Sequence, residues 1–414
     1  MKYRDYKYTY LKISISLLIP FLLISNEQLY SQDQTLDLTG PYLGQEPPGM
    51  VPQLFAPEEL QSNSEWWWHG ALAFTPDGKE FYLDIYVPAN NTGIQIRFIE
   101  MINNVWTLPR SPSFVGSAMD ASPSLTDNGN KVFFISTRPN GDTYGVWTST
   151  RNQIGWSAPV QVNIPYTSSL QRGWRISATT DETLYLRMKD NTMNTDMDIY
   201  QVRNINGVYS APERLDDNIN SSYMDLSAFI DPEENYIIFA SNRPGGYGGT
   251  DLYISSKDKD GSWKSAINMG EPVNSSAGED SPFVSADGLY LFFNSDRHQQ
   301  YDRNPYWVDA QVIYNLITDV ENEDSSPIYF SLAQNHPNPF NPATTIEFTL
   351  PKSEFVELKV YNLLGQEVST LVSNKLNQGN HTYTFYGKNL TSGVYYYRIE
   401  AGNIVQTRKM IYLK

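Results

Sequence analysis

Carboxylates recur at one place in a repeated pattern of this sequence. Aligning the repeats puts five residues just ahead of the strands that we expect to lie innermost in successive sheets: Gly70, Asp120, Arg175, Asp225 and Glu279. If those strands surround one channel, the side chains converge at one of its mouths. Carboxylates on separate strands can act as general acid and general base in glycoside cleavage, with their separation setting the stereochemical outcome. Asp120, Asp225 and Glu279 are therefore candidate catalytic residues.

Ring-bearing residues beside these positions extend the hypothesis to ligand binding. EWWW (65–68) comes directly before His69, and Trp174 comes directly before Arg175. Exposed tryptophan rings would offer flat faces to sugars. The predicted ligand-binding set is His69, Asp120, Trp174, Arg175, Asp225 and Glu279. A structural interpretation stays open, in which the acids cap turns, Arg175 neutralises them and the tryptophans pack between sheets.

Other repeated features favour structural roles. The arginines of an S-x-R pattern, Arg138, Arg243 and Arg297, recur with the repeat, as does GTD at Asp251. The glycines of GGYGG (245–249) could suggest a phosphate loop, but such loops lead from a strand into a helix. No helical period follows here, and Pro244 favours a turn. We expect these glycines to supply positive φ angles in a connection between two strands.

The sequence lacks the residues that several kinds of chemistry require. The chain has no cysteine, which excludes disulfides, thiol nucleophiles and thiolate-bound metals. The histidines, His69, His298, His336 and His381, show no metal-binding spacing, and the G-x-S-x-G elbow of the α/β-hydrolases is missing. We therefore expect no metal and no cofactor.

The elements that position the candidate residues come from an internal repeat. DPEENYIIFASNRPGGYGGTDLYIS has relatives along the chain, and their turn residues are Asp77, Asn128, Asp181, Glu234 and Asp287, at intervals of 51, 53, 53 and 53 residues. Each unit contains four short alternating stretches and no helical period, which predicts four strands. A period near fifty residues is typical of a propeller.

The number of blades follows from the fourth strands. The fifth unit stops after YWVDAQVIYNL, and its missing strand appears ahead of the first unit in PQLFAPEEL, with Pro57 in register. An N-terminal strand that completes the last sheet leaves no exposed edge. We predict five blades, with six as the alternative if an irregular one escapes the alignment.

The repeats resemble the WD40-like (PD40) propeller repeats of the family that includes TolB. SPFVSADGLYLFFNS, TPDGKEFY, SNRPGGYGGTDLY and STRPNG carry the resemblance, which covers about residues 53 to 316. It implies a propeller fold and leaves the function open, since propellers host many unrelated activities.

Both ends of the chain carry features typical of segments outside the propeller. MKYRDYKYTYLK carries four positive charges before the short apolar run ISISLLIPFLLI, which predicts a cleaved signal peptide over residues 1–32 rather than a transmembrane anchor. The propeller is then expected over 33–316 and an acidic linker over 317–333. Residues 334–414 alternate over about seven short strands, which predicts a small immunoglobulin-like β-sandwich.

Four blocks in this last segment resemble the type A sorting domain of the type IX secretion system. They are PNPFNP, LKVYNLLGQEV, SGVYYYRI and TRKMIYLK, in that order. The resemblance implies an outer-membrane-crossing cargo of the Bacteroidota or a related lineage. It also implies recognition by the secretion machinery and a final location at the cell surface or outside the cell.

Composition narrows the partners. A formal net charge of -16 argues against nucleic acid and against electrostatic docking to an anionic membrane. We therefore predict an all-β, exported propeller that binds a glycan, a peptidoglycan fragment or a protein. The alternatives are a glycoside hydrolase that uses Asp120, Asp225 and Glu279, and a surface scaffold without a small ligand.

Overall fold

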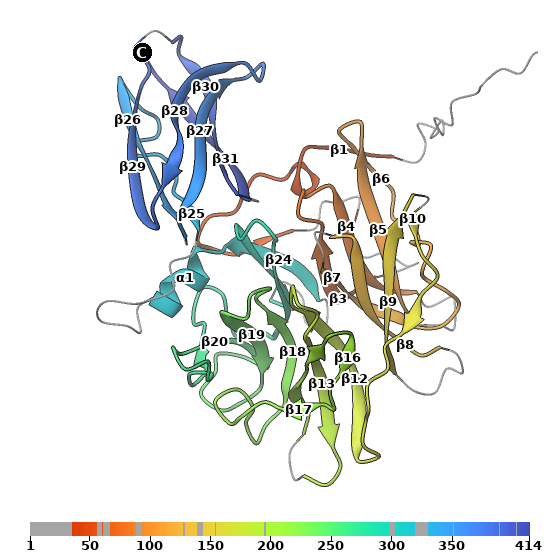
Figure 1. Cartoon of the computed structure of the whole chain (residues 1–414). Coiled ribbons are helices and arrows are strands. Elements are labelled where there is room, and N and C mark those ends of the chain that lie inside the picture. The colour runs from red at the N-terminus through yellow and green to blue at the C-terminus, as the bar shows by residue number, and fades with distance from the viewer. Residues whose placement is uncertain are drawn as a thin grey trace, which may run out of the picture.

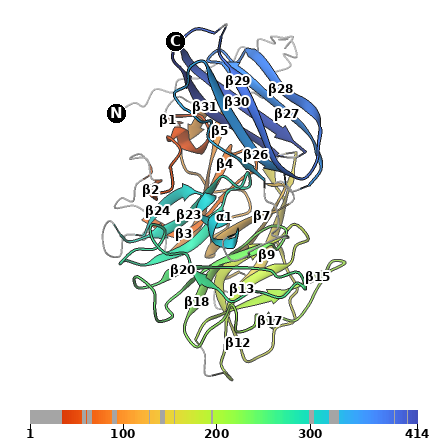
Figure 2. The same ribbon diagram turned by 90° about the vertical axis from the view of Figure 1, so that its left-hand side faces the viewer.

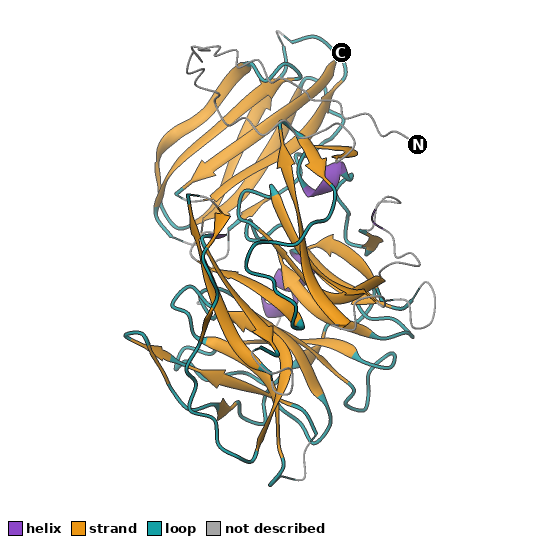
Figure 3. Cartoon of the chain, turned by 90° about the vertical axis from the view of Figure 1, so that its right-hand side faces the viewer, coloured by secondary structure: helices purple, strands orange, loops and turns teal. Residues whose placement is uncertain are grey.

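The protein is almost entirely β-structure. The computed structural model describes residues 35–55, 60, 67–87, 93–126, 129–138, 144–153, 155–193, 196–297, 303–318, 330–350, 352–388, 390–402 and 404–414. Within them lie one α-helix, α1 (Gln311–Thr318), and one short 3-10 turn, η2 (Tyr42–Gly44). Figure 1 shows a group of sheets and, in blue, a smaller sandwich, and Figure 3 shows that strands build both. The predicted signal peptide and most of the predicted linker lie outside the described residues.

Five sheets form the larger part. The first orders its strands β3 (Trp67–Phe74), β4 (Glu80–Val87), β5 (Gly93–Ile102), β6 (Val105–Thr107) and β1 (Thr35–Thr39). The second orders β7 (Asp120–Thr126), β8 (Lys131–Ser136), β9 (Gly145–Asn152) and β10 (Gly155–Trp156), with β11 (Val160–Gln161) also paired to β9. The third orders β12 (Leu170–Ala178), β13 (Leu184–Asp190), β14 (Asp198–Val202) and β17 (Glu213–Arg214), beside a hairpin of β15 (Asn204–Ile205) and β16 (Val208–Tyr209). The fourth orders β18 (Asp225–Ile230), β19 (Tyr236–Ser241), β20 (Asp251–Ser256) and β21 (Ile267–Asn268). The fifth orders β22 (Glu279–Val284), β23 (Tyr290–Ser295), β24 (Asn304–Asp309) and β2 (Gln53–Leu54).

The first strand of each repeat lies innermost. β3 contacts β7, β7 contacts β12, β12 contacts β18, β18 contacts β22, and β22 contacts β3 again. This cyclic order arranges the sheets as the blades of a propeller around one axis. The N-terminal strand was predicted to complete the last sheet, and this is confirmed, because Gln53 and Leu54 of β2 pair with Trp307 and Tyr306 of β24. Pro57 lies outside the described residues.

Aromatic side chains fill the space between the first and fifth sheets. Phe55 is buried, and its ring centroid lies 5.0 Å from that of Phe292 and 5.1 Å from that of Trp307. Phe74 stacks on Phe81 at 4.4 Å and lies 5.9 Å from Phe55. Burial and ring contacts of this kind stabilise a fold without disulfides. The high aromatic content therefore has a packing role.

One turn position has positive φ in every sheet. It lies between the first and second strands, at Gly78 (+64°), Gly129 (+82°), Glu182 (+65°), Glu234 (+58°) and Gly288 (+69°). Glycine adopts this conformation without steric cost, which explains the repeated Asp/Asn-Gly. The two glutamates adopt it with partners: Lys131 donates to Glu182 at 2.6 Å and Tyr185 donates to Glu234 at 2.7 Å.

GGYGG lies between β19 and β20, as predicted, and no helix follows it. The predicted reason for its glycines was right at one position, since Gly245 has a φ of +92° and the other three lack positive φ. Gly246 and Gly248 serve close approach instead. A Cβ on Gly246 would overlap the Asp251 carboxylate, and one on Gly248 would overlap the Ala277 carbonyl of the next repeat.

The C-terminal sandwich has seven strands, as predicted. One sheet orders β25 (Ser331–Leu332), β26 (Ala343–Leu350) and β29 (Gly379–Tyr386), and the other orders β28 (Glu367–Leu376), β27 (Glu354–Asn362), β30 (Gly393–Ala401) and β31 (Ile404–Tyr412). Ile346, Leu358, Tyr397 and Met410 are fully buried in its core. Figure 2 shows the sandwich above the fifth sheet. Here Gln406 of β31 donates to the Asp287 carbonyl at 3.0 Å.

Candidate functional site

The three predicted carboxylates are internal parts of their sheets. Asp120, Asp225 and Glu279 have no solvent exposure. Asp225 accepts from Arg243 at 2.6 Å and from the backbone and hydroxyl of Ser221 at 2.6 and 2.8 Å. Asp120 pairs with Arg138 and accepts from the backbone of Gly116 at 2.9 Å.

The fifth sheet repeats this arrangement. Glu279 accepts from Arg297 at 3.1 Å, from the hydroxyl of Ser275 at 2.6 Å and from that of Ser295 at 2.8 Å. A carboxylate that starts the innermost strand is thus bound to the arginine that follows the second strand of its own sheet. We call each such pair a blade latch. Buried charges are tolerated when paired and hydrogen-bonded in this way.

Each latch arginine lies over aromatic rings of its own sheet. Arg243 lies 5.2 Å from the ring centroid of Phe239 and 4.8 Å from that of Tyr253. Its Nε donates to Ser241, two residues earlier, at 3.0 Å. Cation–π contacts and the hydroxyl acceptor together explain why S-x-R repeats with aromatic strands. The expectation that these arginines are structural is confirmed.

The predicted alignment of the candidate residues needs a correction. Asp120 pairs across the sheet with Ser136, Asp225 with Ser241, and Glu279 with Ser295, so the carboxylates share one register position. In the first and third sheets that position is held by Trp67 and Gln171. Gly70 and Arg175 lie further along β3 and β12, within bulges that shift the register. The bulges are the reason why alignment by sequence failed there.

The hypothesis of a joint carboxylate site must therefore be revised. Asp120, Asp225 and Glu279 each pair with a latch arginine inside three separate sheets, and none of these residues is exposed, although Asp120 Oδ1 has no hydrogen-bond partner. General acid or base work requires contact with the substrate. The ion pairs are those that the structural interpretation expects, and a ligand-binding role for the three residues stays a prediction.

Arg175 instead occupies the middle of the ring. Its guanidinium donates to Ser122 at 3.2 Å, to Ser227 at 3.2 Å and to Ser281 at 2.9 Å, and it lies 3.4 Å from Asp84. These partners come from the four other sheets. Arg175 is only 5 % exposed, and a Cβ on Gly70 would overlap its guanidinium. Gly70 therefore leaves room for the central arginine.

The serines around Arg175 belong to a repeated feature of the innermost strands. Ser122, Ser227 and Ser281 lie two residues after the latch carboxylates, with φ of +56°, +37° and +54°. Non-glycine residues adopt such angles only when their surroundings hold them there, and functional sites concentrate such residues. The strained bulges bring these hydroxyls to the guanidinium.

Charges of both signs surround the central arginine. Asp84 is fully buried, and its two carboxylate oxygens share the backbone N–H of Ser122, at 3.0 and 2.9 Å. Burial, together with the charge of nearby Arg175, lowers the pKa of Arg187 to about 10. Burial alone would raise the pKa of Asp280, but the charges of Arg175 and Arg303 outweigh it and lower that pKa. Asp280 is therefore ionised at neutral pH.

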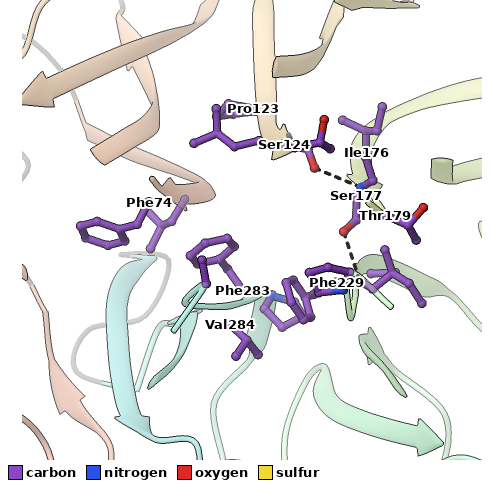
Figure 4. Close-up of a pocket in the computed structure, with 18 of the residues that line it drawn as sticks. Phe74, Pro123, Ser124, Ile176, Ser177, Thr179, Phe229, Phe283 and Val284 are labelled. Atoms are coloured by element: carbon purple, nitrogen blue, oxygen red, sulfur yellow. Dashed lines mark hydrogen bonds between the residues drawn. The ribbon is translucent and has the colours of Figure 1, made fainter. Parts of the chain in front are cut away.

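A cavity of about 500 Å³ runs along the axis and ends at Arg175, and we call it the axial cavity. Its lining comes from all five innermost strands and from the turns that follow them, and it includes Leu72, Phe74, Ser124, Ile176, Ser177, Phe229 and Phe283. Figure 4 shows Phe229 and Phe283 inside it, with ring centroids 5.9 Å apart. The dashed lines mark Ser124 and Ser177 bonding the backbone of the next sheet, at 3.0 and 3.1 Å.

Two predicted ligand residues stay untested. His69 lies on β3 and Trp174 on β12, but their side chains lie outside the described parts of the structure. Among the predicted residues whose side chains the structure describes, Arg175 alone lines the axial cavity. Sequence reasoning missed the cavity aromatics and the serines. The signal for the serines was present, in the repeated D-x-S or E-x-S at the start of three innermost strands.

Comparison with known families identifies the sandwich. Residues 335–413 match the family described as the secretion system C-terminal sorting domain. The tail therefore implies recognition by the type IX secretion machinery and indicates a protein exported to the cell surface or beyond. In the described part of the chain, no helix has the length and hydropathy needed to cross a membrane.

Solved structures offer distant likenesses. The chain is 15% identical to an α-L-arabinofuranosidase from Lactobacillus brevis, over 66% of this chain and 93% of that one, with a TM-score of 0.35. It is 9% identical to a protein of unknown function from Dyadobacter fermentans, over 82% and 98%, with a TM-score of 0.39. PorZ, a surface component of the type IX secretion system of Porphyromonas gingivalis, is 13% identical over 83% of this chain and 44% of its own, with a TM-score of 0.29. The chain thus spans less than half of PorZ. No curated protein matches the sequence. At these identities and TM-scores, none of the likenesses carries a functional argument.

Proposed function

We propose that this chain is an exported binding protein of the cell surface or the extracellular space, and that its propeller takes an apolar group of a ligand into the axial cavity. The cavity itself carries the proposal, because a well-formed pocket with aromatic walls and a few converging polar groups is the usual form of a ligand site. The repeats are proposed to be of the WD40-like, PD40 type, on the resemblance of their sequences.

The lining favours one kind of ligand. Phe74, Phe229 and Phe283 offer ring faces to an apolar body, while Arg175 and the hydroxyl of Ser227 offer polar contacts at the closed end. A peptide or partner protein that inserts an apolar side chain meets both requirements. Of the three kinds of partner that the sequence allows, a glycan, a peptidoglycan fragment or a protein, we propose a protein for this cavity.

Catalysis is not favoured by any observation at the candidate residues. A carboxylate hydrolase needs an acid and a base that reach the substrate. The latches hold the carboxylates of Asp120, Asp225 and Glu279 inside the sheets. The scaffold alternative is separated from binding by the following experiment.

The test blocks the cavity at its mouth. Ala286 lines the cavity and is exposed, so Ala286→Trp fills the entrance without disturbing the core. The probe is 8-anilinonaphthalene-1-sulfonate, whose rings fit the aromatic wall and whose sulfonate fits Arg175. We expect fluorescence enhancement with the full chain and its loss in Ala286→Trp. Ala211→Trp is the matched control, since Ala211 is exposed and does not line the cavity.

The same pair of variants is then applied to a library of short apolar peptides. Peptide binding that Ala286→Trp abolishes and Ala211→Trp preserves supports the proposal. Equal probe and peptide binding in both variants would contradict it and favour the scaffold alternative.

A further inference from the structure

A second cavity lies on the other side of the central arginine, between the fourth and fifth sheets. Its volume is about 570 Å³, and we call it the mouth pocket. Its polar lining is Thr250, Ser276, Asp280, Asn294, Asp296 and Arg303. Asn294 donates to the Gly70 carbonyl at 2.9 Å, and Gly70 lies directly against the Arg175 guanidinium, which places the pocket next to the closed end of the axial cavity. None of these six residues lines the axial cavity.

The walls of the mouth pocket are fixed by hydrogen bonds in which at least one partner is a backbone group. Gly249 donates to the Ala277 carbonyl at 2.8 Å, and the absence of a side chain on Gly248 lets the two loops meet. Gly278 donates to Asp296 at 2.6 Å, and Thr250 donates to the Glu279 carbonyl at 2.8 Å. GGYGG therefore builds one wall of this pocket against the following repeat.

One polar atom in the wall has no partner in the protein. Asn294 is 1 % exposed, and its Nδ2 donates to the Gly70 carbonyl at 2.9 Å. That bond fixes the orientation of the amide, so Oδ1 is the atom left over, and it has no hydrogen-bond partner. Buried acceptors are nearly always satisfied in folded proteins. An unsatisfied acceptor on a cavity wall therefore indicates a donor supplied from outside the chain.

The remaining groups supply both kinds of hydrogen-bonding partner. Asp280 and Asp296 are acceptors, and Arg303 is a donor whose side chain is 54 % exposed while it bonds Asp280 at 3.2 Å. Sugar hydroxyls both donate and accept, so adjacent hydroxyls can bond a carboxylate or amide oxygen and a guanidinium at once. Two carboxylates and one guanidinium leave no excess positive charge for a polyanion.

We propose that the mouth pocket binds a neutral sugar unit, with Asn294 Oδ1 and Asp296 accepting from its hydroxyls and Arg303 donating to them. The site is separate from the axial cavity and does not depend on the function proposed for it. Its two acceptors and its donor belong to β23 (Tyr290–Ser295), the residue after it, and the residue before β24 (Asn304–Asp309). The fifth sheet therefore positions the sugar.

The experiment uses the full chain and defined probes, namely xylotriose, cellotriose, arabinotriose and mannotriose. Binding is measured by titration calorimetry and by ligand-observed NMR. We expect at least one trisaccharide to bind, and Arg303→Ala and Asp296→Asn each to weaken it about tenfold or more, as the loss of a charge-assisted hydrogen bond predicts. Asn294→Leu should weaken it as well.

Two controls keep the result specific. Arg398→Ala removes a guanidinium of comparable exposure, 45 %, in the sandwich and should leave sugar binding unchanged. Ala286→Trp blocks the axial cavity and should also leave it unchanged, so the two proposals can fail separately. Thermal unfolding of each variant establishes that it is folded.

Three outcomes would overturn the proposal. In the first, none of the trisaccharides binds. In the second, a trisaccharide binds with equal affinity to wild type, Arg303→Ala and Asp296→Asn. In the third, diglycine binds in preference to the sugars and is lost in the same variants, which would make the pocket a site for zwitterions.

Discussion

At the scale of single residues, Arg175 decides how the centre of the ring is built. It donates to three serines from three sheets and faces Asp84 from a fourth. A guanidinium keeps its charge when buried and offers donors in several directions, whereas a lysine offers a point charge. Removing one member of a buried pair leaves the other charge uncompensated, which destabilises proteins by about 3–5 kcal/mol. The arginine thus stabilises the ring and also closes the axial cavity.

Asp280 links this centre to acid stability. Its pKa is lowered in the folded protein, because Arg175 and Arg303 outweigh the effect of burial. A lowered folded-state pKa contributes stability that is present above the unfolded value of about 4 and is lost as the pH falls through the folded value. We predict that wild type loses unfolding free energy below about pH 4 and that Asp280→Asn loses less over the same interval.

Urea unfolding between pH 7 and pH 2.5 measures this difference. The free-energy gap between wild type and Asp280→Asn should be widest near pH 6 and should shrink as the acid range is entered. A gap that stays constant with pH would show that Asp280 is not stabilised as a carboxylate. Asp190→Asn serves as a control, because Asp190 ends β13 away from the ring centre and its pKa is lowered by hydrogen bonds from Thr192.

At the scale of elements, each blade is held by contacts that recur with the repeat. A latch carboxylate, its arginine and the aromatic strands beneath it occur in the second, fourth and fifth sheets. In the third sheet a different pair takes over, with Arg214 donating to the buried Asp198 at 2.8 Å. The sheets therefore share a strand order while differing in the residues that tie the strands together.

Glycine packing between neighbouring repeats gives a prediction at this scale. A Cβ at Gly248 would overlap the backbone carbonyl of Ala277, and backbone cannot move aside as a flexible side chain can. We predict that Gly248→Ala lowers the unfolding free energy by about 1–3 kcal/mol, the usual cost of overpacking. Gly393→Ala is the matched control, because a Cβ there meets nothing within 4 Å and φ is not positive. Chemical denaturation measures the unfolding free energy of both variants, and equal values would contradict the predicted contact.

The repeat, the strand order and the closing N-terminal strand could be predicted from the sequence, because turn residues and alternating aromatics report local structure directly. The latch arginines could be predicted as well, since they repeat. The placement of Arg175 could not. It depends on bulges in β3 and β12 that shift the register, and a bulge leaves no mark in a periodic alignment. The cavities escaped prediction for another reason, because their walls combine residues from several repeats.

At the scale of the whole molecule, the segment before the first repeat holds the ring together at its junction. β1 pairs with β6 of the first sheet, and β2 pairs with β24 of the fifth. Between these strands, Tyr42 donates to Asp287 at 2.7 Å and packs edge-on against Phe74 and Tyr290. One continuous stretch of chain thus spans the place where the first and last sheets meet.

The sandwich contributes less than the N-terminal strands to the stability of the ring. Its core is its own, and its described contacts with the propeller are polar, such as Arg408 to Asp309 at 3.8 Å and Lys409 to Glu46 at 3.4 Å. Partly exposed ion pairs of this kind are worth about 0–1 kcal/mol each. The propeller should therefore keep its fold when the sorting domain is removed.

These two observations predict opposite results for two truncations. A chain that begins at residue 56 lacks β1 and β2, which exposes the outer edges of the first and fifth sheets and leaves Phe292 and Trp307 without Phe55. Unpaired edges promote association, so we expect a lower thermal midpoint and aggregates on size exclusion. A chain that begins at residue 33 and ends at residue 318 loses more residues, but the described strands that it lacks all belong to the sandwich. It should keep the oligomeric state of the full chain, with a midpoint close to that of the full chain. If the first truncation behaves like the second, the N-terminal strands are accessories and the innermost strands alone hold the ring closed.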